Sequence, residues 1–288
     1  MTWVPRTVGV VGAGTMGLGI AQVCANAGLQ VMLFDIRTEQ VSRALDLIAK
    51  NLSREIEKGR CSEELKETIL SNIQPARLLG NVRADVIIEA IAEVIELKQS
   101  IFRQLEDVNG ADTIFVTNTS SISVTSIASE MKDPSRCVGL HFFNPADRMK
   151  LVEIISGDKT NPELVLKMRK FSALIGKTSV ETKDSPGFIV NRVARHFYTE
   201  AFVLEGERIA DVQGIDALMR SAGFRMGPFE LMDLIGVDTN LAVTKSIHAG
   251  FKGAVRFSPS LRQQQLVDSG RLGRKSGRGF YNYGEGEK

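Results

Sequence analysis

The sequence predicts a doubly wound α/β domain followed by a smaller, all-helical domain. Short apolar runs alternate with helical segments up to about residue 184, which is typical of a sheet covered by crossover helices. A glycine-rich loop directly follows the first apolar run, and strand-like runs cease after Pro186-Gly187. Since 288 residues exceed what one modest core requires, we expect a first domain over residues 1–184 and a second over residues 185–288.

The first predicted elements form a βαβ unit. Residues 7–11 are a β-branched run, residues 14–27 have a helical pattern and residues 29–34 are again strand-like. Because parallel strands need a crossover connection, the sheet that begins here is expected to be parallel. Two helices with apolar periodicity follow, at residues 38–58 and 62–70.

Strands and helices continue to alternate through the first domain and give way to helices in the second. We expect strands at residues 86–88, 113–116, 138–140, 152–155 and 178–181, with helices at 93–105 and 161–175. In the second domain we expect helices at residues 188–208, 214–221, 229–235, 239–248 and 260–269. A helical domain this small buries its apolar faces with difficulty, so we expect it to pack against the first domain or a second subunit.

The composition excludes several classes of protein. With 43% hydrophobic and 24% charged residues, the chain has the balance of an ordinary globular protein rather than a disordered one. A net charge of +2 without basic runs interleaved with aromatics predicts no nucleic-acid partner. No stretch is long and apolar enough to span a bilayer, so we expect no membrane partner. Cys24, Cys61 and Cys137 have no metal-ligand spacing, which predicts reduced thiols, no metal and a cytoplasmic location.

The loop after the first strand has the pattern of a Rossmann dinucleotide-binding site. Its first glycine allows the tight turn, the second lets the backbone approach a pyrophosphate, and the third permits close packing of helix on strand. The amino end of the helix then presents unpaired N–H groups and a positive dipole end to the phosphates. The residues expected to bind the cofactor here are Gly12, Gly14, Thr15, Met16 and Gly17.

A carboxylate at the end of the second strand predicts which dinucleotide is bound. Asp35 lies where an acidic side chain accepts hydrogen bonds from the adenosine ribose diol, and this favours NAD. Arg37 could reach a 2′-phosphate, which leaves NADP as the alternative. Because Asp35 would repel that phosphate, NAD is the prediction.

The run His141-Phe142-Phe143-Asn144-Pro145, with Glu153 twelve positions after the histidine, carries the chemistry. An imidazole paired with a carboxylate is a general acid/base unit, because the carboxylate fixes the tautomer and favours the imidazolium. Hydride transfer from an alcohol carbon also requires removal of the hydroxyl proton. Downstream of a dinucleotide site, this pair therefore predicts alcohol–ketone redox chemistry.

Together these residues resemble the short-chain 3-hydroxyacyl-CoA dehydrogenases of fatty-acid β-oxidation and butanoate metabolism. The resemblance runs nearly from end to end of the chain and is carried by seven segments, residues 9–21, 118–121, 141–145, 149–153, 186–192, 226–231 and 273–281. It implies reversible, NAD-linked oxidation of an (S)-3-hydroxyacyl-CoA in a cleft between two domains. It also implies a homodimer formed through the helical domain.

The resemblance assigns roles to individual residues. His141 would be the general base that takes the 3-hydroxyl proton, and Glu153 would orient it. Ser120 and Asn191 match positions that hydrogen-bond the reacting oxygen and the substrate, where such groups favour developing negative charge. Family positions that line the nicotinamide and its ribose are matched here by Glu93, Lys98 and Asn118.

A basic stripe suggests where coenzyme A binds. Lys50, Arg54 and Lys58 recur every four residues and so share one helix face, which suits the phosphates of coenzyme A. A solvated helix face explains the same spacing equally well. The family places a lysine that contacts coenzyme A near Lys58.

Two features leave alternatives open. Asp147-Arg148 stands where family members commonly carry an apolar pair, so Arg148 could meet an acyl-chain carboxylate, as in 3-hydroxyadipyl-CoA. The related 3-hydroxyisobutyrate and 6-phosphogluconate dehydrogenases use a catalytic lysine where this chain has Asn191. A non-catalytic NAD-binding protein is the alternative from another class, although the joint presence of the four catalytic-site residues argues against it.

Overall fold

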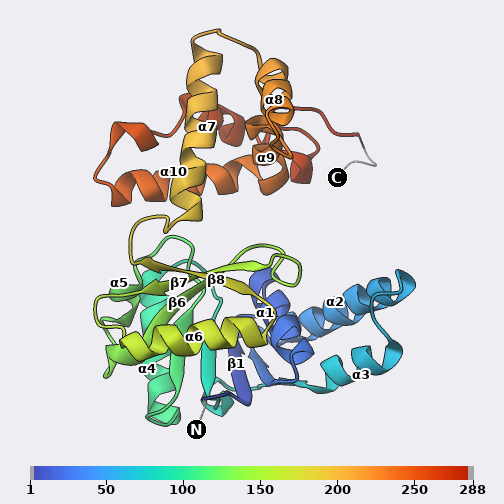
Figure 1. The fold of residues 1–288 in the computed structure, drawn as a ribbon, viewed down its shortest axis with the longest axis vertical. Helices are drawn as coiled ribbons and strands as arrows, with labels where there is room; N and C mark the ends of the chain where they lie inside the picture. Colours follow the sequence, from blue (N-terminus) through green and yellow to red (C-terminus); the bar gives the residue numbers. More distant parts are fainter. Residues whose placement is uncertain (1–2, 285–288) are drawn as a thin grey trace. The chain divides into compact units, whose positions relative to one another are not determined.

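The chain folds into two compact units, residues 1–185 and 186–288. The structure is a computed structural model and describes residues 3–284 (Figure 1). Each unit has its own hydrophobic core.

The first unit is built on an eight-stranded sheet with the order β3-β2-β1-β4-β5-β6-β7-β8. The strands are β1 (Thr7–Val11), β2 (Gln30–Phe34), β3 (Ile73–Pro75), β4 (Val86–Glu89), β5 (Ile114–Thr117), β6 (Cys137–Phe142), β7 (Leu151–Ser156) and β8 (Thr178–Lys183). The chain leaves β1 toward β2 on one side and later returns to β4 on the other. This is the switch point of a doubly wound sheet, where ligands bind outside the carboxyl ends of the strands. The predicted fold class is confirmed.

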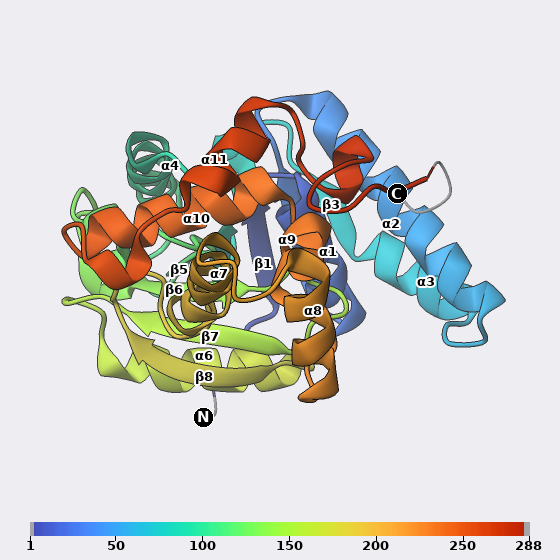
Figure 2. The ribbon, with the colours of Figure 1, turned by 90° about the horizontal axis from the view of Figure 1, so that it is seen from above.

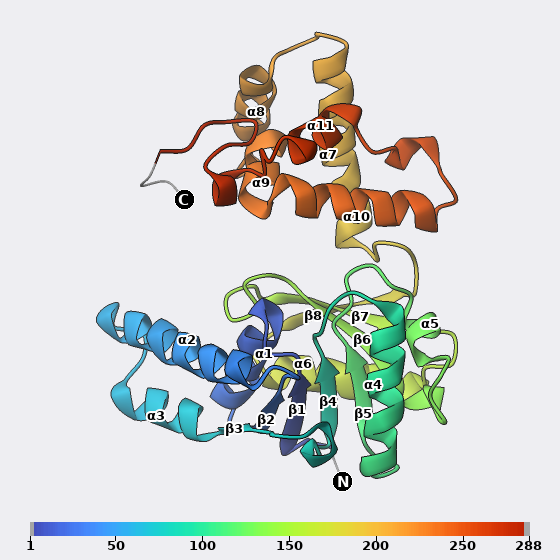
Figure 3. The same ribbon diagram turned by 180° about the vertical axis from the view of Figure 1, so that it is seen from behind.

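Helices cover both faces of this sheet. The central strands β4, β5 and β6 are buried at every position, as expected of strands packed on both sides. Helix α6 (Pro162–Leu174) lies on one face (Figure 1) and α4 (Ile95–Val108) on the other (Figure 3). Helix α5 (Val124–Ala128) is capped by the Ser123 side chain, which accepts a hydrogen bond from Ser126 N.

The first three helices position the nucleotide loop and the basic stripe. Helix α1 (Thr15–Asn26) follows β1 directly. Helices α2 (Thr38–Glu57) and α3 (Glu63–Ser71) lie side by side as a hairpin (Figure 2). A stripe of buried side chains on α2, namely Val41, Ala44, Ile48 and Leu52, belongs to the hydrophobic core of the first unit.

Three details of the first unit differ from our predictions. Strands β6 and β7 are antiparallel, because residues 143–150 are too few for a crossover helix. Strand β3 was not predicted, since its three residues include two exposed ones and show no apolar run. Helix α4 begins at Ile95 rather than at Glu93, so Glu93 lies in the loop before the helix.

The second unit is helical, as predicted. Its helices are α7 (Val190–Gly206), α8 (Val212–Ser221), α9 (Pro228–Ile235), α10 (Val237–Gly250) and α11 (Leu261–Asp268). Helix α10 crosses α7 (Figure 1), and the core includes the aromatic rings of Tyr198, Phe202 and Phe229. The carboxylate of Asp233 accepts hydrogen bonds from Phe280 N and Tyr281 N and so ties down the last described segment. Among the described helices, none combines the length and apolarity that a membrane crossing requires.

Candidate active site

The glycine-rich loop is shaped by close backbone contacts. Gly12 has a φ of +106°, and a Cβ there would lie 2.4 Å from Ala90 O. A Cβ on Gly17 would lie 1.7 Å from Gly12 O, so the helix can approach the loop this closely only with glycine. By contrast, an ideal Cβ on Gly14 meets no described atom within 4 Å. Gly14 therefore faces open space at the amino end of α1.

The amino end of α1 suits a diphosphate. Thr15 and Met16 open the helix, and no side chain of the described residues caps it. Its first N–H groups and the positive end of the helix dipole therefore point to the space beside Gly14. The backbone thus offers the cradle that a dinucleotide requires.

Asp35 lies just beyond β2 and is hydrogen-bonded to the glycine-rich loop. Its Oδ2 accepts a hydrogen bond from Ala13 N at 2.9 Å, and its Oδ1 accepts one from Arg37 N at 3.0 Å. The carboxylate is therefore fixed at the carboxyl edge of the sheet, next to the glycine loop. Its lone pairs that are not used by these two donors suit the hydroxyls of a ribose.

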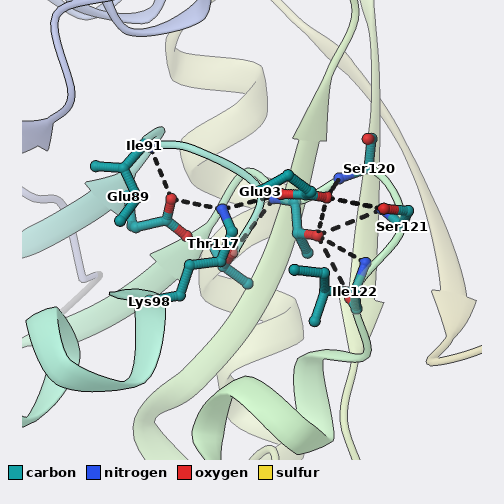
Figure 4. A network of polar contacts seen from close by, with 9 residues as sticks. Glu89, Ile91, Glu93, Lys98, Thr117, Ser120, Ser121 and Ile122 are labelled. Atoms are coloured by element: carbon teal, nitrogen blue, oxygen red, sulfur yellow. Dashed lines mark hydrogen bonds and ion pairs between the residues drawn. The ribbon is translucent and has the colours of Figure 1, made fainter. Parts of the chain in front are cut away.

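A buried ionic network lies at the ends of β4 and β5 (Figure 4). Lys98 Nζ lies 2.7 Å from Glu89 Oε1 and 3.0 Å from Glu93 Oε2. The side chain of Lys98 is 1% exposed and that of Glu89 is fully buried, whereas that of Glu93 is 36% exposed. Burial alone would raise the pKa of Glu93, but the charge of Lys98 and the hydrogen bonds to the carboxylate outweigh it and lower this pKa.

The loop after β5 is held by that network. Glu93 Oε1 accepts hydrogen bonds from Thr119 Oγ1 at 2.6 Å, from Ser120 N at 3.0 Å and from Ser121 N at 3.1 Å. Asn118 Oδ1 accepts a hydrogen bond from Phe142 N at 2.9 Å. The loop that carries Ser120 is thereby fixed to the residue directly after His141.

His141 and Glu153 face each other across β6 and β7. The antiparallel register pairs the two residues directly, and His141 Nδ1 lies 2.7 Å from Glu153 Oε2. His141 is 6% exposed and Glu153 is 0% exposed. A short hydrogen bond to a buried carboxylate fixes the ring orientation and favours the tautomer with hydrogen on Nδ1. The Phe143 ring packs on the imidazole, with 4.6 Å between ring centroids.

The basic residues predicted to bind coenzyme A lie on α2 and at its carboxyl end. Lys50 and Arg54 are exposed on this helix, and Lys58, the residue directly after its last one, is exposed as well. Lys58 Nζ lies 3.5 Å from Glu55 Oε1, so its charge is partly neutralised within the helix. All three side chains are exposed, and the ion pair with Glu55 reduces the net positive charge at the carboxyl end of the stripe.

Arg148 is one of the residues that line a cavity of about 380 Å³ in the first unit. Its side chain is 68% exposed and lies 3.9 Å from Glu55 Oε1 and 3.8 Å from Asp147 Oδ2. These are long, weak ion pairs, so the guanidinium can exchange them for another carboxylate.

Asn191 belongs to the second unit. It lies in the first turn of α7, and its carbonyl oxygen accepts a hydrogen bond from Arg195 Nε at 3.1 Å. Arg195 is itself buried, and its Nη1 donates to Asn240 O at 3.0 Å and to Thr244 Oγ1 at 2.8 Å. The backbone at Asn191 is therefore anchored to α10.

Two polar residues of the network were missed in the sequence. Glu89 ends an apolar strand, and an acid at that position is a signal that could have been used. Thr117 Oγ1 donates to Glu89 Oε2 at 2.7 Å, but a threonine in a β-branched strand carries no such signal.

Comparison with known proteins identifies the family. The model of the 3-hydroxyacyl-CoA dehydrogenase NAD-binding domain matches residues 7–185, and that of the 3-hydroxyacyl-CoA dehydrogenase C-terminal domain matches residues 187–283. The 3-hydroxyadipyl-CoA dehydrogenase of Escherichia coli K12 is 48% identical over 96% of this chain, which spans 59% of that relative's length. A probable 3-hydroxybutyryl-CoA dehydrogenase of Bacillus subtilis is 39% identical, with 97% of this chain and 98% of that protein covered.

Solved structures agree with this match. The 3-hydroxybutyryl-CoA dehydrogenase structure from Escherichia coli K12 has a TM-score of 0.95 at 47% identity, covering 98% of this chain and 60% of that one. The (S)-3-hydroxybutyryl-CoA dehydrogenase of Ralstonia eutropha has a TM-score of 0.94 at 38% identity, covering 98% of this chain and all of that one. The predicted family and cofactor are confirmed. The chain therefore belongs to the 3-hydroxyacyl-CoA dehydrogenase family and is an NAD-dependent oxidoreductase.

Proposed function

We propose that the chain catalyses reversible oxidation of a short-chain (S)-3-hydroxyacyl-CoA, such as 3-hydroxybutyryl-CoA, to the 3-oxoacyl-CoA. The observation that carries this proposal is the buried His141–Glu153 pair, at 2.7 Å, whose histidine lies on β6, next to β5, the strand that leads into the Ser120 loop. The substrates named for the relatives and structural neighbours support the acyl-CoA class and the short chain.

His141 is the general base in this proposal. Because Nδ1 is engaged with Glu153, Nε2 is the ring nitrogen that takes the 3-hydroxyl proton, and the carboxylate stabilises the imidazolium that forms. Bound NAD supplies the hydride acceptor. Ser120 and Asn191 hydrogen-bond the reacting oxygen and substrate, which favours alkoxide-like charge at that oxygen.

We also propose which residues bind the cofactor and coenzyme A. We assign the cofactor to Gly12, Gly14, Thr15, Met16, Gly17, Asp35, Glu93, Lys98 and Asn118. The open space at Gly14 and the uncapped amino end of α1, as far as the described residues extend, support the diphosphate position. We assign coenzyme A to Ser120 and to the exposed stripe of Lys50, Arg54 and Lys58.

The test is the loss of NADH absorbance on adding acetoacetyl-CoA. We expect rapid turnover by the wild type, a loss of at least about 100-fold in His141→Gln because general-base catalysis contributes roughly 10²–10⁴-fold, and little use of NADPH. His248→Gln, a histidine substitution on α10, is the control and should retain activity. A folded wild type that binds NADH but consumes none with any acyl-CoA would favour the non-catalytic alternative.

A second candidate substrate is a dicarboxylic acyl-CoA such as 3-hydroxyadipyl-CoA. The name of the Escherichia coli relative supports it, and so do the long, exchangeable ion pairs of Arg148. We expect Arg148→Ala to lower kcat/KM for 3-hydroxyadipyl-CoA by about tenfold, as the loss of one ion pair to a substrate carboxylate implies, and to leave 3-hydroxybutyryl-CoA nearly unchanged. Equal losses on both substrates would remove the specific role of Arg148.

We also propose a homodimer formed through the helical unit, in the cytoplasm. Support for the dimer comes from exposed apolar side chains there, including Ile209, Leu218 and Leu261. The cytoplasmic location is supported by the free thiols of Cys24 and Cys137, both buried. Sedimentation at micromolar concentration tests the dimer, and a monomer under these conditions would contradict it.

A further inference from the structure

Glu89 is a buried carboxylate that is not among the residues assigned to the site, and it contacts Lys98 and Thr117. We propose that Glu89 is a positioning residue, which fixes the Lys98 ammonium and, through it, Glu93 and the backbone that carries Ser120. This inference rests on the function proposed above, because that function assigns Glu93, Lys98 and Ser120 to cofactor and substrate.

Glu89 has a donor on each of its oxygens. Its Oε1 accepts hydrogen bonds from Lys98 Nζ at 2.7 Å and from Ile91 N at 2.8 Å, and its Oε2 accepts one from Thr117 Oγ1 at 2.7 Å (Figure 4). The residue is 0% exposed. A buried carboxylate is stable only when its charge and lone pairs are satisfied, so these three donors hold it in one orientation.

Glu89 determines where the ammonium of Lys98 lies. A lysine head is a compact charge on a flexible four-carbon stem and has no preferred direction of its own. In this chain Nζ lies between Glu89 Oε1 at 2.7 Å and Glu93 Oε2 at 3.0 Å. Of these two carboxylates, Glu89 lies on a buried strand whereas Glu93 lies in a loop. The strand residue is therefore the fixed reference, and the loop residue is placed by the lysine.

Two hydrogen-bonded paths lead from Glu89 to the Ser120 loop. The first runs through Lys98 to Glu93, whose Oε1 accepts Ser120 N at 3.0 Å. The second runs through Thr117, whose Oγ1 accepts Thr119 N at 3.3 Å. Both paths end on the same short backbone segment, so a change at Glu89 displaces it from two directions.

The charge count argues for a role beyond packing. The ammonium of Lys98 is shared by the carboxylates of Glu89 and Glu93. A single ion pair would need only one of these carboxylates, so the second adds a negative charge that the stability of the pair does not require. Glu106 offers the contrast, because it lies on the same helix as Lys98 and is also buried. It lies eight residues after Lys98 on α4 (106 − 98). It pairs with Arg136 at 2.8 Å and accepts hydrogen bonds from Lys132 N and Asp133 N. Glu106 therefore serves as the matched structural carboxylate.

The experiment compares Glu89→Gln with Glu106→Gln. The measurements are the dissociation constant of NADH from its fluorescence, the melting temperature without cofactor, and the amide hydrogen exchange of residues 119–121. We expect both variants to melt at a lower temperature. In Glu89→Gln alone, we also expect NADH affinity to fall about tenfold and exchange in residues 119–121 to accelerate.

Two results would overturn the proposal. One is an NADH dissociation constant for Glu89→Gln within twofold of the wild type, with unchanged exchange at residues 119–121. The other is an equal loss of NADH affinity in Glu106→Gln, which would reduce the effect to general destabilisation. Should Glu89→Gln fail to fold, Thr117→Val tests the second path. We expect this variant to lose NADH affinity about threefold. An unchanged NADH affinity would contradict the proposal.

This test remains distinct from the test of the proposed function. A wild type that turns over no acyl-CoA would remove the proposed reaction, whereas the NADH affinities and exchange rates would still decide the role of Glu89. Conversely, full acyl-CoA turnover by the wild type leaves the proposed reaction intact even where Glu89→Gln binds NADH normally.

Discussion

Replacing Glu153 by glutamine tests the contribution of the buried carboxylate to proton transfer. The substitution keeps the shape of the side chain and removes its charge at a position that is 0% exposed and 2.7 Å from His141 Nδ1. The glutamine oxygen can still accept from Nδ1, so the ring keeps its place. What is lost is the charge that stabilises the imidazolium as the substrate proton arrives.

The expected size of the effect follows from that geometry. A hydrogen bond to a charged group contributes about 1.5–3 kcal/mol in a buried setting. Since about 1.36 kcal/mol corresponds to a tenfold change in rate, kcat should fall roughly 10- to 160-fold. The affinity for NADH should change little, because Glu153 lies on β7, four strands along the sheet from β1, which leads into the glycine loop.

The assay is turnover of acetoacetyl-CoA at saturating NADH, together with NADH binding by fluorescence. Glu181→Gln is the control, because Glu181 lies on the neighbouring strand β8 and pairs with the exposed Arg169. The reasoning would be refuted by a folded Glu153→Gln enzyme whose kcat stays within threefold of the wild type. A parallel collapse of NADH binding would refute it as well, since the effect would then not be confined to proton transfer.

Three further predictions concern the loop, the network and the helical unit. Gly17→Ala should lower both the melting temperature and NADH affinity because its Cβ meets Gly12 O, whereas Gly14→Ala should spare the melting temperature and lower only NADH affinity in titrations. Because the pKa of Glu93 is lowered in the folded state, its stabilising contribution is present above the ordinary value of 4.5 and is lost as pH falls through the folded-state pKa. The free energies of unfolding of the wild type and Glu93→Gln should therefore differ most above about pH 5 and approach each other at acid pH. Asp233→Asn should lower the unfolding free energy by about 1.5–3 kcal/mol in denaturant titrations, because the carboxylate holds Phe280 N and Tyr281 N.

The parts that sequence predicted well are those set by local pattern. The run of residues 7–11 became β1 with the same bounds, because a short β-branched run before a glycine turn has few alternatives. Asn161-Pro162 correctly predicted the start of α6, since the asparagine side chain accepts Glu163 N and proline suits the first turn. The glycine loop was equally local, because the spacing marks Gly12 and Gly17, the two positions of the loop at which a Cβ would meet backbone atoms.

The parts that sequence did not predict depend on pairing at a distance. The buried partnership of Glu89 and Lys98 joins the end of a strand to a helix, and nothing in either segment alone marks the contact. The placement of Glu93 in a loop rather than in α4 has the same origin. Its carboxylate is used by Lys98 and by the loop after β5, and helix propensity carries no information about such partners.

The reversal of β7 explains why the His141–Glu153 pair is so well fixed. A carboxylate at the end of a parallel strand would reach the imidazole from a loop, whereas Glu153 lies within a strand that is buried along its middle. The antiparallel register sets it directly opposite His141, flanked by pairs of Leu140 with Ile154 and Phe142 with Val152. A slip of one residue would turn Glu153 to the other face and place an aliphatic side chain opposite the imidazole. The short connection that ruled out a parallel strand is therefore also what gives the histidine its partner.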